Sequence, residues 1–303
     1  MNIVAAGGTG FLGGALVAAL AARGDETVVL TRDADRAAAR LGGRARAVAW
    51  DARSSGEWAK SLEGADAVVN LAGTGVADAR WTPPRKIALV KSRLDATRAL
   101  VAAISQAAAR PKVLVSASAV GWYGESPEGD APETAPQGRD FLAALCGQWE
   151  REASAAEPLG LRVVLARVGV VLGRGGALAR MELPFKLGLG GRLGSGRQPF
   201  PWIHVDDAVG AILFALESEK LSGPVNLAAP ELPTNAQFTK SLARALRRPA
   251  FLPAPAFALR LLLGEMAGML LGGQRAVPRK LLDAGYAFRF PTADAALAAL
   301  YPR

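Results

Sequence analysis

The stretch "SASAVGWYG", residues 116–124, places two serines, a tryptophan and one of only three tyrosines after a β-branched apolar run. The hydroxyls of Ser118 and Tyr123 have the chemistry to hold a substrate oxygen and exchange its proton. The alternative is that this stretch is only the loop where a strand ends. We predict Ser118 and Tyr123 as the catalytic pair.

A glycine-rich segment near the amino terminus predicts a nucleotide-binding turn. In "GGTGFLG", Gly7, Gly10 and Gly13 follow a predicted strand at 2–6 and precede a predicted helix near 12–23. Glycines permit a tight turn and a close approach of the backbone to a pyrophosphate, and the helix terminus offers free N–H groups to the phosphates. This context favours a dinucleotide over a turn without a ligand.

The end of the second predicted strand, "TVVLTRD", favours NADP (NADPH) over NAD. Thr31 and Arg32 stand where an acidic residue would bind the ribose 2′-hydroxyl, and a guanidinium suits a 2′-phosphate. Asp33, one residue later, keeps NAD open as the less favoured cofactor. Asp51 ends the next strand, where it could meet the adenine amino group.

Two further strand ends are expected to meet at the same edge of the sheet. "VVNLAG" ends the fourth strand with small residues such as Ala72 and Gly73, which would let a cofactor lie close. "AWDA", with Asp51, and "VVNLAG" could each also be an ordinary strand terminus. We predict cofactor contacts for Asp51, Leu71, Ala72 and Gly73, and for Ser116 in the fifth strand.

Short β-branched runs alternate with alanine- and leucine-rich runs through the first half, a pattern typical of a parallel sheet between helices. We predict an α/β fold with a Rossmann-type doubly wound sheet and a smaller, mostly helical carboxyl-terminal substrate lobe. The predicted strands are 2–6, 27–31, 46–50, 66–71, 112–117 and 161–167. The predicted helices lie near 12–23, 54–62, 84–109 and 140–156.

The amino-acid composition changes after Gly173, where many glycines and prolines predict a long loop region with short helices. Beyond it we expect a helix from Asp206, a strand in "GPVNLAA", a helix capped by Thr234 or Asn235, and a mostly helical tail. The predicted division is an NADP-binding domain at 1–172, rejoined by 202–228, and a substrate lobe at 173–201 and 229–303.

This second half holds the predicted substrate pocket. Lys186, Arg197, Phe200 and Trp202 could form an aromatic, cationic pocket for an anionic or sugar-like small molecule, or Trp202 could belong to a hydrophobic seam under the lobe. The only histidine, His204, is placed beside that pocket, either as a proton donor or as a residue that fixes the lobe boundary.

Asp206 and Asp207 are adjacent carboxylates at a helix start, where caps are commoner than metal ligands. No other ligand set joins them in the sequence, so we predict no metal. The lone Cys146 excludes an internal disulfide and fits a reducing cytoplasm.

The net charge of +9 comes from scattered arginines without aromatic–basic alternation, so nucleic acid is not expected as a partner. The start "NIVAAGGTG" lacks a basic segment, which predicts no secretory signal. The apolar stretch "FALRLLLGEMAGMLLGG" is short and interrupted by Arg260 and Glu265, so we expect an amphipathic or core helix and no membrane partner. A cytoplasmic monomer or homodimer is the expectation.

The motifs "GGTGFLG", "NLAG", "SASAVGWYG", "RVGVVLGRGG" and "WIHVDDAV" resemble the extended short-chain dehydrogenase/reductase superfamily. More narrowly, "FKLGLGGRLGSGRQPFPWIHVDD" and the tail resemble its epimerase family protein group. The resemblance implies an NADP-binding Rossmann domain with a small carboxyl-terminal substrate lobe. The cofactor-contacting residues that it implies are Gly7, Gly10, Phe11, Leu12, Gly13, Thr31, Arg32, Leu71, Ala72, Arg93 and Val171.

One part of the superfamily pattern is missing. A tyrosine and a lysine four residues apart on the helix after the fifth strand usually transfer the proton, but these positions hold Leu142 and Cys146. We predict an NADP-dependent oxidoreductase or epimerase with another donor, the candidates being Ser118, Tyr123, Lys91, His204 and Asp206. The alternatives are a proton from water or from the substrate, and a non-enzymatic NADPH-binding regulator.

Overall fold

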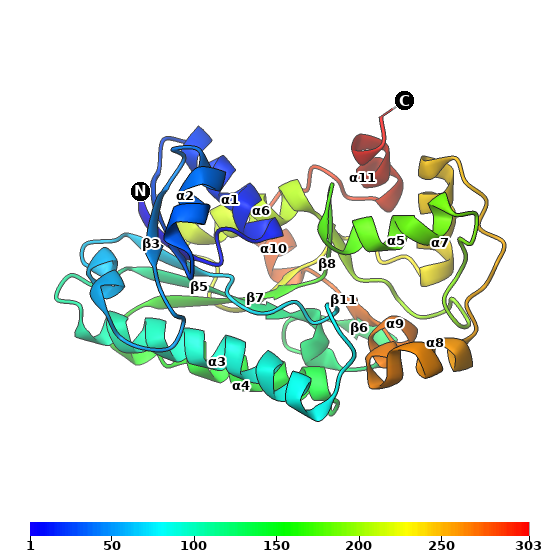
Figure 1. Cartoon of the computed structure of the whole chain (residues 1–303), viewed down its shortest axis with the longest axis horizontal. Helices are drawn as coiled ribbons and strands as arrows, with labels where there is room; N and C mark the ends of the chain where they lie inside the picture. Colours follow the sequence, from blue (N-terminus) through cyan, green and yellow to red (C-terminus); the bar gives the residue numbers. More distant parts are fainter. Residues whose placement is uncertain (303) are drawn as a thin grey trace.

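A seven-stranded parallel sheet forms the centre of the computed structural model, which describes residues 1–302 apart from the side chains of 126–128. The strand order is β10-β7-β5-β4-β1-β2-β3 (Figure 1). The strands are β1 (Asn2–Ala6), β2 (Glu26–Thr31), β3 (Arg46–Ala49), β4 (Ala67–Asn70), β5 (Val113–Ala119), β7 (Arg162–Val168) and β10 (Gly223–Leu227). The predicted α/β fold is confirmed.

Helices cover both faces of this sheet because alternate strand residues point to opposite sides. On one face, Ile3 packs with α1 (Phe11–Ala22) and α6 (Val205–Glu217). On the other, Val4 packs with α3 (Pro83–Gln106) and α4 (Phe141–Ser154), which run along the lower side of the sheet in Figure 1. Both faces are buried, which explains why the strands read as nearly continuous apolar runs.

The second half of the chain has its own hydrophobic cluster around Trp202 and Phe238. The helices at this cluster are α5 (Gly176–Lys186), α7 (Asn235–Leu246) and α11 (Ala293–Leu300). Of the two predicted caps, Thr234 is the N-cap of α7, and it forms a capping box with Gln237 that was not predicted. The domain division stays a prediction, although β10 joins the main sheet as expected of 202–228.

Several elements differ from the expectations. The predicted helix at 54–62 is the 3₁₀ segment η1 (Glu57–Leu62), which follows Gly56. Two small parallel sheets were not predicted: β8 (Val170–Leu172) with β9 (Trp202–His204), and β6 (Ser126–Ala131) with β11 (Gln274–Ala276). The remaining elements are α2 (Ala34–Leu41), η2 (Val120–Tyr123), η3 (Glu157–Leu159), α8 (Ala256–Leu263), η4 (Gly264–Ala267), α9 (Gly268–Leu271) and α10 (Arg279–Asp283).

Within residues 1–302, no helix is long and apolar enough to cross a membrane. Among the residues that the structure describes, no three His, Cys, Asp or Glu side chains lie together in a way that suits a metal ion.

Candidate functional site

The glycine turn between β1 and α1 is held against the end of β4. Gly7 has a φ of +78°, and a methyl group there would lie 2.6 Å from the Leu71 carbonyl. A methyl group on Gly13 would lie 2.2 Å from the Gly7 carbonyl oxygen, so only glycine lets α1 approach this closely. Gly10 caps α1 without a side-chain hydrogen bond, which leaves the first-turn N–H groups available to an anion.

The Phe11 ring, at the start of α1, packs against the loop that follows β8. Methyl groups on Gly173, Gly175 and Gly176 would lie 2.6, 3.3 and 2.9 Å from atoms of this ring. Val171 lies just before this loop and packs on the sheet cluster that also contacts Leu12. Three residues that the resemblance implies at the cofactor therefore lie around one junction.

At the end of β2, the carboxylate of Asp33 already has a structural partner. Asp33 is the N-cap of α2, and its Oδ1 accepts a hydrogen bond from the Arg36 N–H at 3.0 Å. Arg32 is exposed beside Thr31, with a guanidinium that forms no ion pair among the described side chains. The strand end therefore offers an unpaired guanidinium beside a carboxylate that has one oxygen engaged in the helix cap.

Asp51 also has partners within its own loop. Its Oδ1 accepts from the N–H groups of Arg53 and Ser54 at 2.9 Å each, and its Oδ2 accepts from the Ser54 hydroxyl at 2.6 Å. These hydrogen bonds, led by the one from the hydroxyl, lower the pKa of Asp51 to about 2. A contact with adenine would have to share oxygens that already hold the loop.

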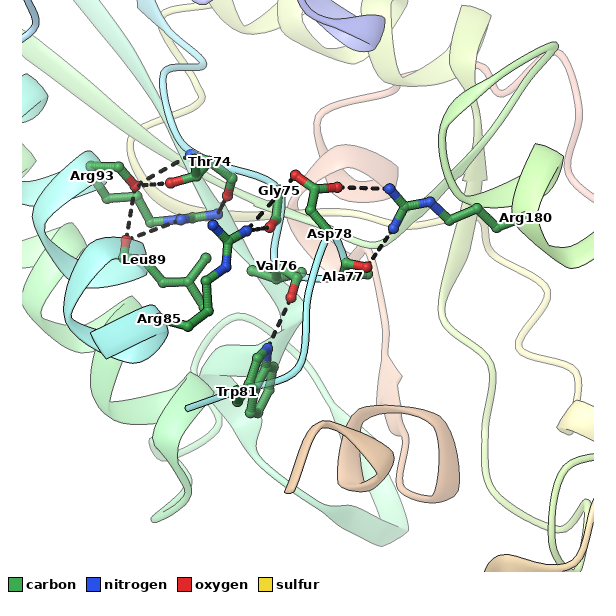
Figure 2. A network of polar contacts seen from close by, with 11 residues as sticks. Thr74, Gly75, Val76, Ala77, Asp78, Trp81, Arg85, Leu89, Arg93 and Arg180 are labelled. Carbon is green, nitrogen blue, oxygen red and sulfur yellow. Dashed lines mark hydrogen bonds and ion pairs between the residues drawn. The ribbon is translucent and has the colours of Figure 1, made fainter. Parts of the chain in front are cut away.

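Arg93 is a buried cation beneath the segment that follows β4. Its guanidinium donates to the carbonyls of Leu89 at 3.1 Å and Thr74 at 3.0 Å (Figure 2). It also lies 5.1 Å from the Trp149 ring centroid. Burial lowers its pKa, and no described carboxylate pairs with it. Gly73 passes over it, where a methyl group would lie 3.2 Å from the guanidinium carbon. The site therefore carries an uncompensated positive charge.

Two more arginines hold the loop 74–81, as Figure 2 shows. Arg85 donates to the Gly75 carbonyl at 2.6 Å, and its Nε is buried without a partner. Arg180 of α5 donates to the Ala77 carbonyl at 2.5 Å and pairs with Asp78 at 2.7 Å. This arrangement joins α5 to the carboxyl edge of the sheet, and the arginines outnumber the carboxylate.

Ser118 and Tyr123 belong to one buried polar network, which we call the Arg167 network. Ser118 donates to Glu150 at 2.6 Å, and Glu150 receives two hydrogen bonds from Arg167, from Nε at 2.8 Å and Nη2 at 2.9 Å. The Tyr123 hydroxyl donates to Asn226 at 2.7 Å and accepts from Arg167 at 3.0 Å.

Both hydroxyls of the predicted pair are therefore already engaged inside the protein. Each residue is only 4% exposed, and burial raises the pKa of Tyr123 despite the nearby Arg167. Ser116 is completely buried, 3.4 Å from the Asn70 side-chain nitrogen. These contacts favour a structural role for Ser118 and Tyr123. Sequence reasoning missed Glu150, Arg167 and Asn226, although an arginine inside the apolar run "VVLARVG" signals a buried partner.

Leu142 and Cys146 face the end of β5, where the superfamily places its tyrosine and lysine. A methyl group on Gly121 would lie 3.2 Å from the Leu142 Cβ, and the Cys146 sulfur is 3.7 Å from the Ala119 carbonyl oxygen. Burial raises the pKa of Cys146 to about 11, so its thiol is protonated near neutral pH. Lys91 lies on α3 and is exposed.

His204 and the two aspartates fix the lobe boundary. The Nδ1 of His204 accepts from the Asp206 N–H at 3.1 Å and caps α6, and burial lowers the pKa of this imidazole. Asp207 accepts from the N–H groups of Arg289 at 2.7 Å and Phe290 at 2.8 Å. This geometry favours the boundary role over proton transfer.

The four residues of the predicted substrate pocket differ in burial and in their partners. Trp202 is completely buried in the hydrophobic cluster, which corresponds to the seam alternative. Phe200 stacks on Phe238 at 4.1 Å, Lys186 pairs with Glu182, and Arg197 is exposed. A hollow of about 320 Å³ lies against α7 and includes none of the predicted pocket residues.

Comparisons with known proteins agree with this architecture. The model of the NAD dependent epimerase/dehydratase family matches residues 3–228, and a domain of unknown function, DUF1731, matches residues 254–300. Epimerase family protein YfhF of Bacillus subtilis (strain 168) is 40% identical over 99% of this chain and 98% of its own. Epimerase family protein Mb2239 of Mycobacterium bovis is 43% identical, over 97% of this chain and 96% of its own.

A crystal structure of human epimerase family protein SDR39U1 (isoform 2) with NADPH superimposes with a TM-score of 0.88 at 38% identity, over 99% of each chain. The resemblance drawn from the sequence motifs is thereby confirmed. Since the family model spans the sheet from β1 to β10 and the relatives match from end to end, this chain belongs to the NAD dependent epimerase/dehydratase family.

Proposed function

We propose that the chain binds NADPH at the carboxyl edge of the sheet. The observation that supports this most is that two groups suited to phosphate stand at this edge. The first is the start of α1, where no side chain caps the N–H groups that follow Gly10, and the second is the exposed Arg32, beside an Asp33 whose carboxylate caps α2. The first suits a pyrophosphate and the second a 2′-phosphate. The NADPH in the human relative supports the same assignment.

Within this proposal, Leu71, Ala72, Gly73 and Val171 line the dinucleotide, and Arg93 supplies the buried charge beside it. When bound, NADPH would supply a hydride for the reduction of a small-molecule carbonyl; in an epimerase, the oxidised form NADP+ would first accept a hydride from the substrate, and the NADPH so formed would return it. The loop 74–81, with Arg85 and Arg180, lies at the same edge and gives an anionic or sugar-like substrate positive charge to meet.

The Arg167 network bears on the source of the proton. Tyr123 donates to Asn226, so release of its proton would leave the buried Asn226 oxygen without this donor. Ser118 donates to Glu150, so release of its proton would place a second negative charge beside a buried carboxylate. We therefore favour water or the substrate as the donor. Ser118 and Tyr123 then serve as positioning residues that hold the ends of β5 and η2.

A second candidate function is a non-enzymatic NADPH-binding regulator. It is favoured by Leu142 and by the protonated Cys146, which leave the usual acid–base positions without a group that titrates near neutral pH. The two candidates share cofactor binding and differ in turnover.

The test combines NADPH titration by calorimetry with NADPH oxidation against a panel of carbonyl compounds and nucleotide sugars. Wild type, Ser118→Ala and Tyr123→Phe are compared under the same conditions. Turnover that both variants retain supports an external proton source, and turnover lost in either correctly folded variant makes that residue the donor. Tight binding without turnover on any substrate favours the regulator, and no binding of NADPH refutes both candidates.

A further inference from the structure

Large apolar side chains are exposed together on one end of the second half of the chain. Phe257 and Leu261 of α8 are 74% and 76% exposed, and no residue of α8 is fully buried. Of the eleven most exposed large apolar residues, eight lie in two segments, and we call them the apolar face. They are Leu183, Leu187, Leu189, Phe251, Leu252, Phe257, Leu261 and Leu262.

The two segments that form the apolar face lie side by side. The N–H of Leu252 donates to the Gly190 carbonyl at 3.2 Å, and the N–H of Ala254 donates to the Arg192 carbonyl at 2.9 Å. A methyl group on Gly191 would lie 1.8 Å from the Leu252 carbonyl oxygen, so the two backbones are in close contact. α8 follows directly, beside α9 at the lower right of Figure 1. These contacts join the two segments into one region of the molecule, where most of the exposed large apolar side chains gather. Such a concentration marks an interaction surface more often than single exposed residues do.

The charges on these two segments all have the same sign. Residues 183–197 and 247–264 contain no aspartate or glutamate. They contain six basic residues, and all six are exposed: Lys186, Arg192, Arg197, Arg247, Arg248 and Arg260. Glu182 and Glu265 lie just outside the two segments, and Glu182 pairs with Lys186. An apolar surface whose own charged residues are all cations is complementary to a partner that is apolar inside and anionic at its surface.

We propose that the apolar face docks on the surface of an anionic lipid bilayer. The leucine and phenylalanine side chains enter the boundary between headgroups and acyl chains, and the arginines contact lipid phosphates while their stems stay in the apolar layer. α8 has 8 residues, which at 1.5 Å per residue span about 12 Å, so it lies in the interface and does not cross the bilayer. The proposal concerns docking at the lipid surface, whereas the sequence-based expectation was of no membrane partner; within residues 1–302 no helix could cross a membrane.

Two other occupants fit less well. A second copy in a two-fold dimer would place the six cations of one face against the six of the other, which is repulsive. A protein partner usually anchors through tryptophan, tyrosine and arginine, whereas leucine, the commonest residue of this face, is under-represented among such anchors. The apolar face shares no residue with the glycine turn, so this proposal is independent of the proposed function.

Vesicle flotation of the full chain tests the proposal. Vesicles of phosphatidylcholine are compared with vesicles of phosphatidylcholine and phosphatidylglycerol. Two double variants are designed to weaken binding to the vesicles. The apolar double variant combines Phe257→Gln with Leu261→Gln, and the charge-reversal variant combines Arg248→Glu with Arg260→Glu. Leu282→Gln is the control, because Leu282 is an exposed leucine of α10 outside the face. Glutamine keeps the helix propensity of α8 high, and the far-UV circular dichroism spectrum and the midpoint of thermal unfolding report that each variant is folded.

The wild type and the control are expected to float with the phosphatidylglycerol vesicles, with less flotation at high salt. The apolar double variant should bind these vesicles about tenfold less tightly or weaker, given the side-chain area withdrawn. The charge-reversal variant should lose the preference for anionic lipid. Absence of flotation, equal flotation on both vesicles, or unchanged flotation of the apolar double variant would overturn the proposal. A dimer in light scattering that the apolar double variant dissociates would make a second copy the occupant instead.

Discussion

Glu150 of α4 and Arg167 of β7 form a two-pronged ion pair with side chains that are only 6% and 2% exposed. The pair joins α4 to the interior of the sheet. Ser118 donates to Glu150, Tyr123 accepts from Arg167, and Asn226 accepts from Tyr123. The Arg167 guanidinium also lies 4.0 Å from the Trp122 ring centroid. Each of the three guanidinium nitrogens of Arg167 therefore donates at least one hydrogen bond within the protein.

Removing one partner of this pair is expected to destabilise the fold strongly. Glu150→Ala leaves a buried guanidinium without a counter-charge, which costs about 3–5 kcal/mol of the free energy of unfolding. Urea denaturation measures this loss. The double variant Glu150→Met with Arg167→Met should lose less than Glu150→Ala, because no buried charge remains. A loss below about 1 kcal/mol in Glu150→Ala would contradict the role given to the pair.

Tyr123→Phe tests the hydroxyl of the same network. Its loss leaves Asn226 and Arg167 each without one hydrogen bond, at a cost of about 1–3 kcal/mol in the free energy of unfolding. NADPH affinity should stay within about twofold of wild type, because the hydroxyl faces the interior. Thermal unfolding and calorimetric titration measure the two effects. Unchanged stability with lost turnover would instead make Tyr123 catalytic.

Gly13 and Gly14 are neighbours on α1 with opposite expected responses to alanine. The Gly13 methyl would overlap the Gly7 carbonyl oxygen, so Gly13→Ala should destabilise the protein by about 1–3 kcal/mol and weaken NADPH binding. The Gly14 methyl would lie 3.9 Å from the Gly8 carbonyl oxygen, so Gly14→Ala should stabilise the helix by about 0.5–1 kcal/mol. Equal effects of the two substitutions on unfolding would refute the close contact.

Arg32→Ala should reduce NADPH affinity about tenfold and leave NADH affinity unchanged, because only NADPH has a 2′-phosphate for the guanidinium. Arg40→Ala is the matched control, since it removes the same charge from an exposed position in the last turn of α2. Fluorescence titration with both dinucleotides measures the ratio. If the ratio stays constant, or changes equally in the control, Arg32 does not select the cofactor.

The lowered pKa of His204 predicts how the free energy of unfolding depends on pH. Burial lowers its pKa in the folded protein, outweighing Asp206 and Asp207, so the unfolded chain binds a proton first as the pH falls. The contribution of His204 is present above about pH 6.5 and is lost as the pH falls below it. His204→Asn keeps an N-cap acceptor without this titration. The drop in unfolding free energy between about pH 7 and pH 5 should therefore be smaller in the variant; an equal drop would contradict the assignment.

The main strands could be predicted because each is a local signal, a short apolar run that ends at glycine or a polar residue. The cap of α7 is equally local, since Thr234 and Gln237 are three residues apart. The small sheets were missed because β8 and β9 have three residues each and pair only with distant segments. Gln274 donates to the Gly124 carbonyl from 150 residues away, and no local pattern records such a contact.

The candidate site likewise has residues that the sequence could predict and residues whose environment it could not. The positions of Gly7 and Gly13 follow from spacing, because a turn and a helix start need those glycines. The burial of Trp202 depends on residues of α5, α7 and α11, which converge only in the folded chain. Likewise, "SASAVGWYG" gives the hydroxyls of Ser118 and Tyr123 but not their partners, which come from α4 and from β10.

The position of β10 at one edge of the sheet has a consequence for synthesis of the chain. β7 pairs with β5 on one side and with β10 on the other, and Tyr123 is joined to Asn226 across 103 residues. While residues beyond 222 are still inside the ribosome, β7 can pair with β5 but its other edge has no partner. The Tyr123 hydroxyl, which contacts Arg167, then also lacks its acceptor Asn226. A nascent chain stopped at that point exposes an aggregation-prone strand, so the domain completes its folding only after the ribosome has released β10.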